Sequence, residues 1–218
     1  MPNISKAYVR LAIFDADGVV TSSKKFAEDL EKDFGIKPES LTSFFQGPFQ
    51  DVLIGKADLK EALEPYLKEW GWKKTVDEFL EYWFRSEDIV NTVVTDTISR
   101  LRESGIKCYL ATNQEKYHLA YMRDVMGFKQ VFNGLFSSAD LGCKKPEPQF
   151  FDRLLKRIDP KREIPRREIL LWDDSEANVS AAKELGIQAY RYVDPLSFQE
   201  KMQQVPLMAP RFLKKRKR

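Results

Sequence analysis

Short runs of apolar, β-prone residues recur along the chain and set the first expectation about its fold. Continuous apolar runs of this length are typical of parallel strands that are buried on both faces of a sheet. The runs lie at residues 9–14, 107–111, 134–138, 168–172 and 189–193. The pattern therefore predicts a buried parallel sheet.

Helical patterns separate the last four of these runs. Three of them end directly before Gly105, Gly127 or Gly186, and a glycine just past a helix is a usual stop signal. The predicted helices cover residues 95–104, 114–126, 148–158 and 177–185. Strands that alternate with helices predict an α/β fold with a doubly wound parallel sheet, similar to the Rossmann fold.

Residues 21–92 break this rhythm, because they contain no good strand. Asp58 and Thr75 each precede an apolar-periodic segment and are predicted to be helix N-caps. The helices expected here cover residues 24–34, 41–49, 59–70 and 76–85. We therefore expect an inserted, small α-helical cap domain at 21–92, over an α/β core built from residues 1–20 and 93–218.

The predicted cap is rich in aromatic residues. Most of them are expected to form the core of the small helical domain, and one or two are candidates to line a substrate pocket. They are Phe44, Phe45, Phe49, Tyr66, Trp70, Trp72, Phe79, Tyr82, Trp83 and Phe84.

The composition indicates a folded protein with a basic C-terminal segment. The chain has 218 residues, of which 43% are hydrophobic and 32% charged, as expected for a folded protein. The formal net charge is +3, but residues 214–218 are all Lys or Arg, so the rest of the chain sums to −2. We interpret the tail as a solvated, frayed end rather than a nucleic-acid contact or a localisation signal. Nothing else resembles a nucleic-acid module, so no nucleic-acid partner is expected.

The expected location is cytoplasmic. No apolar run approaches the roughly 20 residues needed to span a membrane, and the first ten residues lack the apolar core of a signal peptide. Cys108 and Cys143 are expected to be free thiols, which suits a reducing compartment, and two cysteines with one histidine make no zinc site. The oligomeric state is left open.

Polar residues follow the predicted strands at the edge where ligands bind in open α/β sheets. They are Asp15 and Asp17, Thr112 and Asn113, Lys145 in the loop after the third strand, and Asp173 and Asp174. Residues i and i+2 of an extended chain face the same way, so Asp15 and Asp17 can act on one reacting centre. Gly18 allows the tight turn that follows.

The charges of these residues favour a particular chemistry. With Asp17 protonated, the acidic residues and Lys145 leave a formal charge of −2, which would repel a phosphate dianion unless a hard cation such as Mg²⁺ is bound. Thr112 and Asn113 can donate to phosphoryl oxygens, and Lys145 can neutralise developing charge. The chemistry that fits is phosphoryl transfer to Asp15, followed by attack of a water that Asp17 activates.

The motifs DADGV, ATN, LGCKKPEP and LWDDSEAN, in this order, resemble the four motifs of the haloacid dehalogenase-like superfamily. The resemblance implies that Asp15 is the nucleophile and Asp17 the general acid and base. It implies Mg²⁺ on the Asp15 carboxylate, the Asp17 carbonyl and Asp174, with Asp173 assisting. Thr112 and Lys145 carry over as phosphate contacts, and Asn113 as a neighbour of the pocket.

The segments LIGKADLKE, KKPEPQFF and WDDSEANVSAAKELG look most similar to sugar-1-phosphate phosphatases and to the phosphatase domain that precedes soluble epoxide hydrolase. Asn178 departs from the pattern, because many members have a further Asp there. The leading hypothesis is a Mg²⁺-dependent phosphatase for a small phosphomonoester, with sugar phosphates among the candidates. A 2-haloacid dehalogenase, a phosphomutase and a non-catalytic interaction protein are the alternatives, and Asp17 argues against the first. His118, the only histidine, is expected at the surface or in packing rather than in catalysis.

Overall fold

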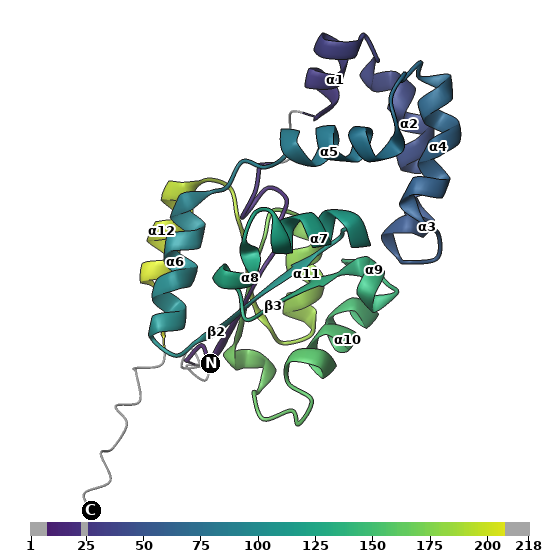
Figure 1. Ribbon diagram of the computed structural model, residues 1–218. Coiled ribbons are helices and arrows are strands. Elements are labelled where there is room, and N and C mark those ends of the chain that lie inside the picture. Colours follow the sequence, from purple (N-terminus) through teal and green to yellow (C-terminus); the bar gives the residue numbers. More distant parts are fainter. Residues whose placement is uncertain (1–7, 23–25, 208–218) are drawn as a thin grey trace, which may run out of the picture.

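A five-stranded parallel sheet in the order β3-β2-β1-β4-β5 forms the centre of the computed structural model, which describes residues 8–22 and 26–207 (Figure 1). The strands are β1 (Leu11–Phe14), β2 (Lys107–Thr112), β3 (Gly134–Ser137), β4 (Ile169–Asp173) and β5 (Gln188–Arg191). All four strand pairs are parallel. The doubly wound α/β sheet predicted from the apolar runs is confirmed.

Helices cover both faces of the sheet because successive side chains of a strand point to opposite sides. Ala12 and Phe14 pack on one face with residues from helices α6, α7, α8 and α12. Leu11 and Ile13 pack on the other face with α9, α10 and α11. These helices are α6 (Thr92–Glu103), α7 (Lys116–Asp124), α8 (Phe128–Val131), α9 (Ser138–Leu141), α10 (Pro148–Ile158), α11 (Glu176–Glu184) and α12 (Pro195–Gln203), and a 3₁₀ turn, η1 (Arg166–Glu168), precedes β4.

Five further helices follow β1 and form a group of their own, seen at the top of Figure 1. They are α1 (Phe26–Phe34), α2 (Pro38–Gln46), α3 (Phe49–Leu53), α4 (Leu59–Glu69) and α5 (Val76–Ser86). Their buried side chains make one cluster, which contains all ten aromatic residues named above as core or as close neighbours. The expectation that most of these aromatics form a core is therefore confirmed. We call this group the helical cap; its predicted limits at residues 21 and 92 stay a prediction.

Several predicted helix limits were wrong. The helix expected at 41–49 is two helices, since the chain turns at Gly47 and Pro48 between α2 and α3. The helix expected at 114–126 begins later, because Glu115 accepts from the backbone N–H groups of Tyr117 and His118 and so caps α7. The sequence analysis also missed α12, which Asp194 caps and Pro195 begins.

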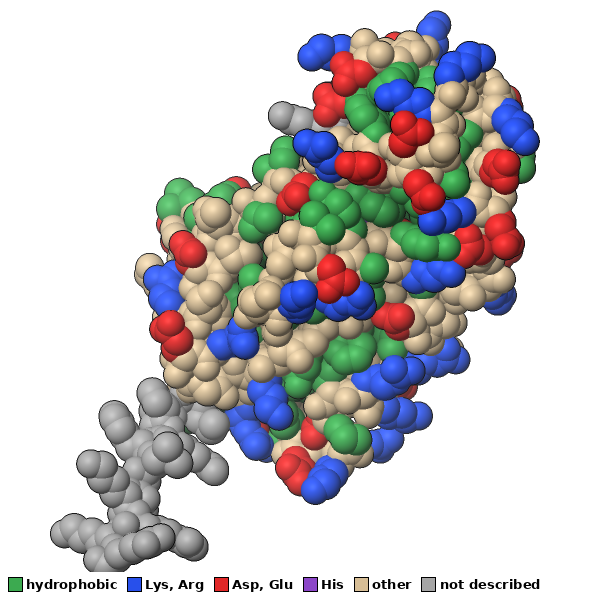
Figure 2. Space-filling view, viewed as in Figure 1, with side chains coloured by type: hydrophobic (Ala, Val, Ile, Leu, Met, Phe, Trp, Pro, Cys, Tyr) green, Lys and Arg blue, Asp and Glu red, His purple; other side chains and the backbone are tan. Residues whose placement is uncertain are grey.

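The two segments that join the cap to the core run side by side. Ser22 N–H donates to the carbonyl of Ile89 at 3.0 Å, and Asn91 N–H donates to that of Val20 at 2.8 Å. A second connection lies at α4, whose N-cap Asp58 accepts from Lys116 Nζ at 2.6 Å and from the Tyr117 hydroxyl at 2.8 Å. In Figure 2, hydrophobic side chains gather along the boundary between cap and core on the face shown.

Among the described residues, no helix is long and apolar enough to cross a membrane. Cys108 and Cys143 are free thiols, as predicted, and both are buried. The basic segment 214–218 lies outside the described residues.

Candidate active site

Three neighbouring strands bring the predicted site residues to one edge of the sheet. Phe14 at the end of β1 pairs with Leu110 in β2 and with Trp172 in β4. Asp15 stays in register with β4, because its N–H donates to the Trp172 carbonyl at 2.9 Å. The side chains that follow these strands therefore meet, as the carboxyl ends of parallel strands require.

Lys145 lies at the centre of this edge and links two of its carboxylates. Its side chain is 1% exposed, and Nζ is 2.8 Å from Asp15 Oδ1 and 2.6 Å from Asp173 Oδ2. Burial alone would lower the pKa of Lys145, but the two aspartates raise it overall. The lysine therefore stays charged in the interior because it is paired on both sides.

Asn113 fixes the main chain at Lys145. Asn113 Oδ1 accepts from the Lys145 N–H at 2.8 Å, and Asn113 Nδ2 donates to the Lys145 carbonyl at 2.9 Å. These bonds show a positioning role that the sequence analysis did not foresee. The phosphate contact predicted for Asn113 stays a prediction, and both polar atoms of its amide already bond to the Lys145 backbone.

Asp15 is a buried carboxylate close to the charged groups of Lys145 and Asp173. Burial raises its pKa to about 8; Lys145 opposes this rise, and Asp173 adds to it. One oxygen accepts from the N–H of Ala16 at 2.8 Å, so the carboxylate is held from the backbone side as well.

Asp17 has different partners from Asp15. Its Oδ2 accepts from Gln114 Nε2 at 2.9 Å, and its Oδ1 accepts from the Thr21 hydroxyl at 3.3 Å. Burial raises its pKa, while these hydrogen bonds and Lys145 act in the opposite direction. Sequence reasoning missed Gln114, although its position two residues after Thr112, at the same sheet edge, was a usable signal.

Three carboxylates could hold a metal ion. One oxygen each from Asp15, Asp173 and Asp174 lies within 4.8 Å of the others. Asp173 is fixed by the Ser175 N–H at 3.0 Å and by Asn178 Nδ2 at 2.9 Å, both of which donate to its Oδ1. Asn178, the departure from the family pattern, therefore orients an acidic residue of this cluster.

Gly18 makes room for Asp174. Its φ is +75°, and a Cβ at this position would lie 2.3 Å from Asp174 Oδ2. A side chain here would displace the carboxylate and strain the turn, so the glycine of the DADG motif keeps Asp174 in the acidic cluster.

Thr112 ends β2 with a hydroxyl that is buried and makes no hydrogen bond within the described part of the chain. Buried polar atoms without a partner are rare and call for an explanation. An anion bound beside the strand ends would supply the missing acceptor.

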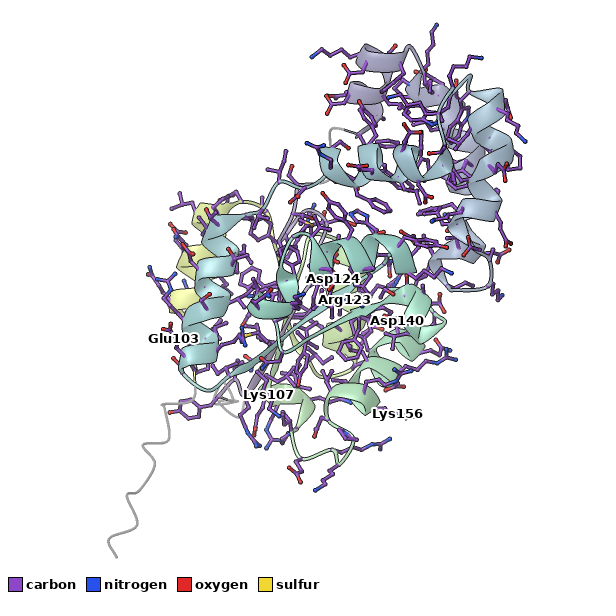
Figure 3. All side chains as sticks on the ribbon, in the orientation of Figure 1. Glu103, Lys107, Arg123, Asp124, Asp140 and Lys156 are labelled. Carbon is purple, nitrogen blue, oxygen red and sulfur yellow. The ribbon has the colours of Figure 1, made fainter. Side chains whose placement is uncertain are left out.

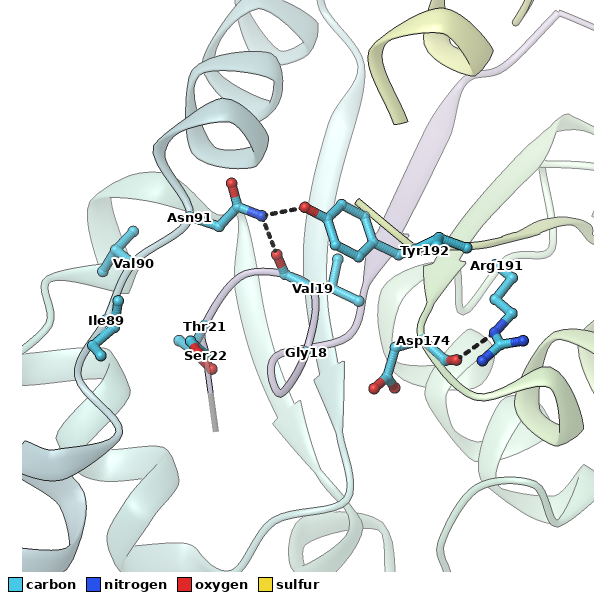
Figure 4. Close-up of a pocket in the computed structure, with 11 residues that line it drawn as sticks. Gly18, Val19, Thr21, Ser22, Ile89, Val90, Asn91, Asp174, Arg191 and Tyr192 are labelled. Atoms are coloured by element: carbon cyan, nitrogen blue, oxygen red, sulfur yellow. Dashed lines mark hydrogen bonds between the residues drawn. The ribbon is translucent and has the colours of Figure 1, made fainter. Parts of the chain in front are cut away.

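A hollow of about 470 Å³ opens beside Asp174 (Figure 4). Its walls come from the turn after Asp17, the segment that returns from the cap, and the end of β5. Asn91 crosses between these parts, as its Nδ2 donates to the carbonyl of Val19 at 2.9 Å and to the hydroxyl of Tyr192 at 2.6 Å. Arg191 Nε donates to the carbonyl of Asp174 at 3.0 Å. Of the residues that line the hollow, the sequence analysis named Gly18 and Asp174 but not Asn91, Arg191 or Tyr192.

His118 lies in packing, in agreement with the sequence analysis. Its ring is buried and stacks on Phe84 of the cap, with ring centroids 4.4 Å apart and an interplanar angle of 13°. Burial lowers its pKa to about 4.

The stability of the protein should fall more steeply in acid than that of a His118→Leu variant. The folded-state pKa of about 4 lies below the ordinary value of 6.5, so between these values the unfolded chain binds a proton that the folded chain does not. The contribution of neutral His118 to the free energy of unfolding is present above pH 6.5 and is lost as the pH falls toward 4. It amounts to about 3 kcal/mol. Urea unfolding at several pH values measures it, and equal pH dependence in both proteins would contradict the assignment.

Comparisons with known proteins agree with this geometry. A family model described as haloacid dehalogenase-like hydrolase matches residues 9–186. D-ribitol-5-phosphate phosphatase of Bacteroides thetaiotaomicron is 26% identical over 151 residues, which covers 66% of this chain and 71% of that protein. A sesquiterpene phosphatase of Aspergillus oryzae is 29% identical over 104 residues, 48% of this chain, and the match spans about half of that protein, 51%.

Solved structures give the same fold. A HAD family enzyme from Bacteroides thetaiotaomicron, crystallised with magnesium and inorganic phosphate, superposes with a TM-score of 0.70 at 22% identity, covering 85% of this chain and 94% of that one. Because the matched family model covers residues 9–186, which include every site residue predicted from the sequence, the chain belongs to the haloacid dehalogenase-like hydrolases.

Proposed function

We propose that the protein is a Mg²⁺-dependent phosphatase that hydrolyses a small phosphomonoester through an aspartyl-phosphate on Asp15. The observation that carries this proposal is the pair Asp15 and Asp17, two carboxylates at one strand end with separate partners. Asp15 faces the ammonium group of Lys145, whereas Asp17 is held by the neutral groups of Gln114 and Thr21. Carboxyl groups with different environments can take different roles in one reaction.

The acidic cluster fits a magnesium ion. Carboxylate oxygens are the ligands this cation prefers, and Asp15, Asp173 and Asp174 present them within reach of one centre. When bound, Mg²⁺ would neutralise part of the negative charge shared by the carboxylates and the phosphate. We infer that the Thr112 hydroxyl, which has no hydrogen-bond partner among the described residues, donates to a phosphate oxygen at the same edge.

The residues of the chain can perform both halves of the reaction. The Asp15 carboxylate attacks phosphorus, the bond from phosphorus to the ester oxygen breaks, and protonated Asp17 gives its proton to the leaving alcohol. Asp17 then takes a proton from a water molecule that attacks the aspartyl-phosphate, which releases inorganic phosphate and restores both side chains. Lys145 stabilises the negative charge that develops on the phosphoryl group.

The relatives support phosphate ester hydrolysis on small molecules, since those named above are a D-ribitol-5-phosphate phosphatase and a sesquiterpene phosphatase. A 2-haloacid dehalogenase would need the first aspartate but neither the second nor a metal. A phosphomutase would return the phosphoryl group to the substrate, and a non-catalytic protein would release no phosphate. We propose a cytoplasmic enzyme with no nucleic-acid partner.

Phosphate release should depend completely on a divalent cation. We expect EDTA to abolish turnover of a panel of phosphorylated metabolites and Mg²⁺ to restore it. Ca²⁺ should support it poorly, because its larger and looser coordination misplaces the nucleophile. Malachite green assays with and without each ion measure the effect. Full activity in EDTA, or release of halide from 2-chloropropionate, would overturn the phosphatase proposal.

A further inference from the structure

Residues at the end of β5 hold the main chain of the two adjacent aspartates in the acidic cluster. Asp173 is opposite Arg191 in the register of β4 and β5, and the Tyr192 N–H donates to the Asp173 carbonyl at 2.9 Å. Asp174 comes after the last paired residues of the two strands. Its carbonyl accepts from a side chain instead, because Arg191 Nε donates to it at 3.0 Å.

Asp174 has fewer supports than the other two carboxylates of the cluster. Asp15 and Asp173 are buried, and the ammonium group of Lys145 bridges them. Asp174 is exposed, and among the residues that the structure describes no other residue donates a hydrogen bond to its carboxylate. The placement of this carboxylate therefore depends on how its main chain is held.

The two ends of Asp174 meet different partners. Its carboxylate packs against the turn at Gly18, where a Cβ would lie 2.3 Å from Oδ2. Figure 4 shows the carboxylate turned toward Gly18 and the carbonyl turned toward Arg191. An aspartate carries its carboxyl group on a single methylene with few staggered positions, so a shift of the main chain moves the carboxylate oxygens with it. Such a shift would take Asp174 away from the other ligands of the cluster.

We propose that Arg191 is a positioning residue for the divalent cation, because its hydrogen bond to the Asp174 carbonyl keeps the Asp174 carboxylate in the acidic cluster. The inference rests on the magnesium site of the proposed function and adds a residue to it. Arg191 lies beyond residues 9–186, which the family model matches. Loss of a partner that orients a metal ligand typically weakens metal binding by about tenfold to a hundredfold.

The positive charge of Arg191 gives the proposal a distinctive sign. A guanidinium group is always charged and repels a divalent cation, so electrostatics alone predicts that the cation binds more tightly once the charge is removed. A positioning role predicts the opposite result, because the loss of the hydrogen bond lets the main chain of Asp174 move. The direction of the change in affinity therefore separates the two roles.

Two neutral variants of Arg191 isolate the hydrogen bond. Arg191→Met keeps an unbranched side chain without a donor, whereas Arg191→Gln keeps an N–H group bonded to Cδ, where arginine has Nε. We expect Arg191→Met to raise the Kd for Mn²⁺ by about tenfold to a hundredfold and Arg191→Gln to bind the ion about as tightly as the natural protein. Mn²⁺ suits the same oxygen ligands as Mg²⁺. Electron paramagnetic resonance of free Mn²⁺ measures its Kd without turnover, and competition with Mg²⁺ gives the Kd of that ion.

Arg167→Met is the matched control. Arg167 is an exposed arginine in η1, which precedes β4, so it lies at the opposite end of that strand from Asp173. The Kd of this variant should equal that of the natural protein. If Arg191→Met does not fold, Arg191→Lys takes its place, because lysine keeps the charge but has a methylene group where arginine has Nε; it should weaken Mn²⁺ binding as well.

Mn²⁺ binding by folded Arg191→Met that is as tight as in the natural protein, or tighter, would overturn the inference and leave the proposed function standing. An equal loss of affinity in Arg191→Met and Arg191→Gln would overturn it too, since the hydrogen bond would then not be the cause. If the natural protein binds neither Mn²⁺ nor Mg²⁺, the metal site fails, and the proposed function fails together with the inference.

Discussion

An Asp15→Asn variant should form no phosphoenzyme and should lose turnover by at least about 10⁴-fold, the scale of nucleophile replacements in other hydrolases. The amide keeps the size of the carboxylate and loses the charge that attacks phosphorus. Lys145 keeps Asp173 as a partner at 2.6 Å, so the variant should still fold. Phosphate release and mass spectrometry of acid-quenched protein measure the two effects.

Asp124→Asn is the matched control for this experiment. Asp124 ends α7 at the surface, where it pairs with Arg123 and Lys129 (Figure 3), and its loss should leave turnover unchanged. A phosphorylated Asp15→Asn protein would place the covalent intermediate on another residue and would contradict the mechanism.

Asp17→Asn should separate the acid role from the other functions of the site. The backbone is unchanged and the new amide can still meet Gln114 and Thr21, so phosphate and metal should bind as before. The substitution removes the proton given to the leaving alcohol. General acid assistance of this kind typically raises the rate by 10²–10⁴-fold. The loss in kcat should be largest for alkyl or polyol phosphates, whose leaving groups need that proton. It should be smallest for p-nitrophenyl phosphate.

The comparison of two leaving groups within one variant makes this experiment insensitive to partial misfolding, since inactive protein lowers both rates alike. An equal drop for both esters, with unchanged Mg²⁺ affinity, would remove Asp17 from the first step. A role in activating water for the second step would then be its remaining assignment, and burst kinetics with p-nitrophenyl phosphate would show accumulation of the intermediate.

The local hydrophobic pattern was enough to locate the strands and to predict that most candidate residues lie close together. Parallel strands present their carboxyl ends at one edge, so side chains that follow β1, β2 and β4 had to meet once the alternation of strands and helices was recognised. Asp15, Asp17, Thr112, Asp173 and Asp174 could be selected in this way. The break between α2 and α3 and the helix α12 were missed because short turns and caps outweigh periodicity there.

Long-range partners were decided only by the tertiary structure. Gln114 and Asp17 are 97 residues apart, and their hydrogen bond depends on how the loop after β2 packs over the turn after β1. Asn91 follows the helical block, and its hydrogen bonds to the carbonyl of Val19 and the hydroxyl of Tyr192 join segments that are 72 and 101 residues away in the chain. The sequence determined which strand ends carry carboxylates, because the hydrophobic pattern that marks a strand is local and the residues that follow it can be read directly. The environment that gives each carboxylate its own role is set by side chains distant in the chain, and only the packed structure brings them there.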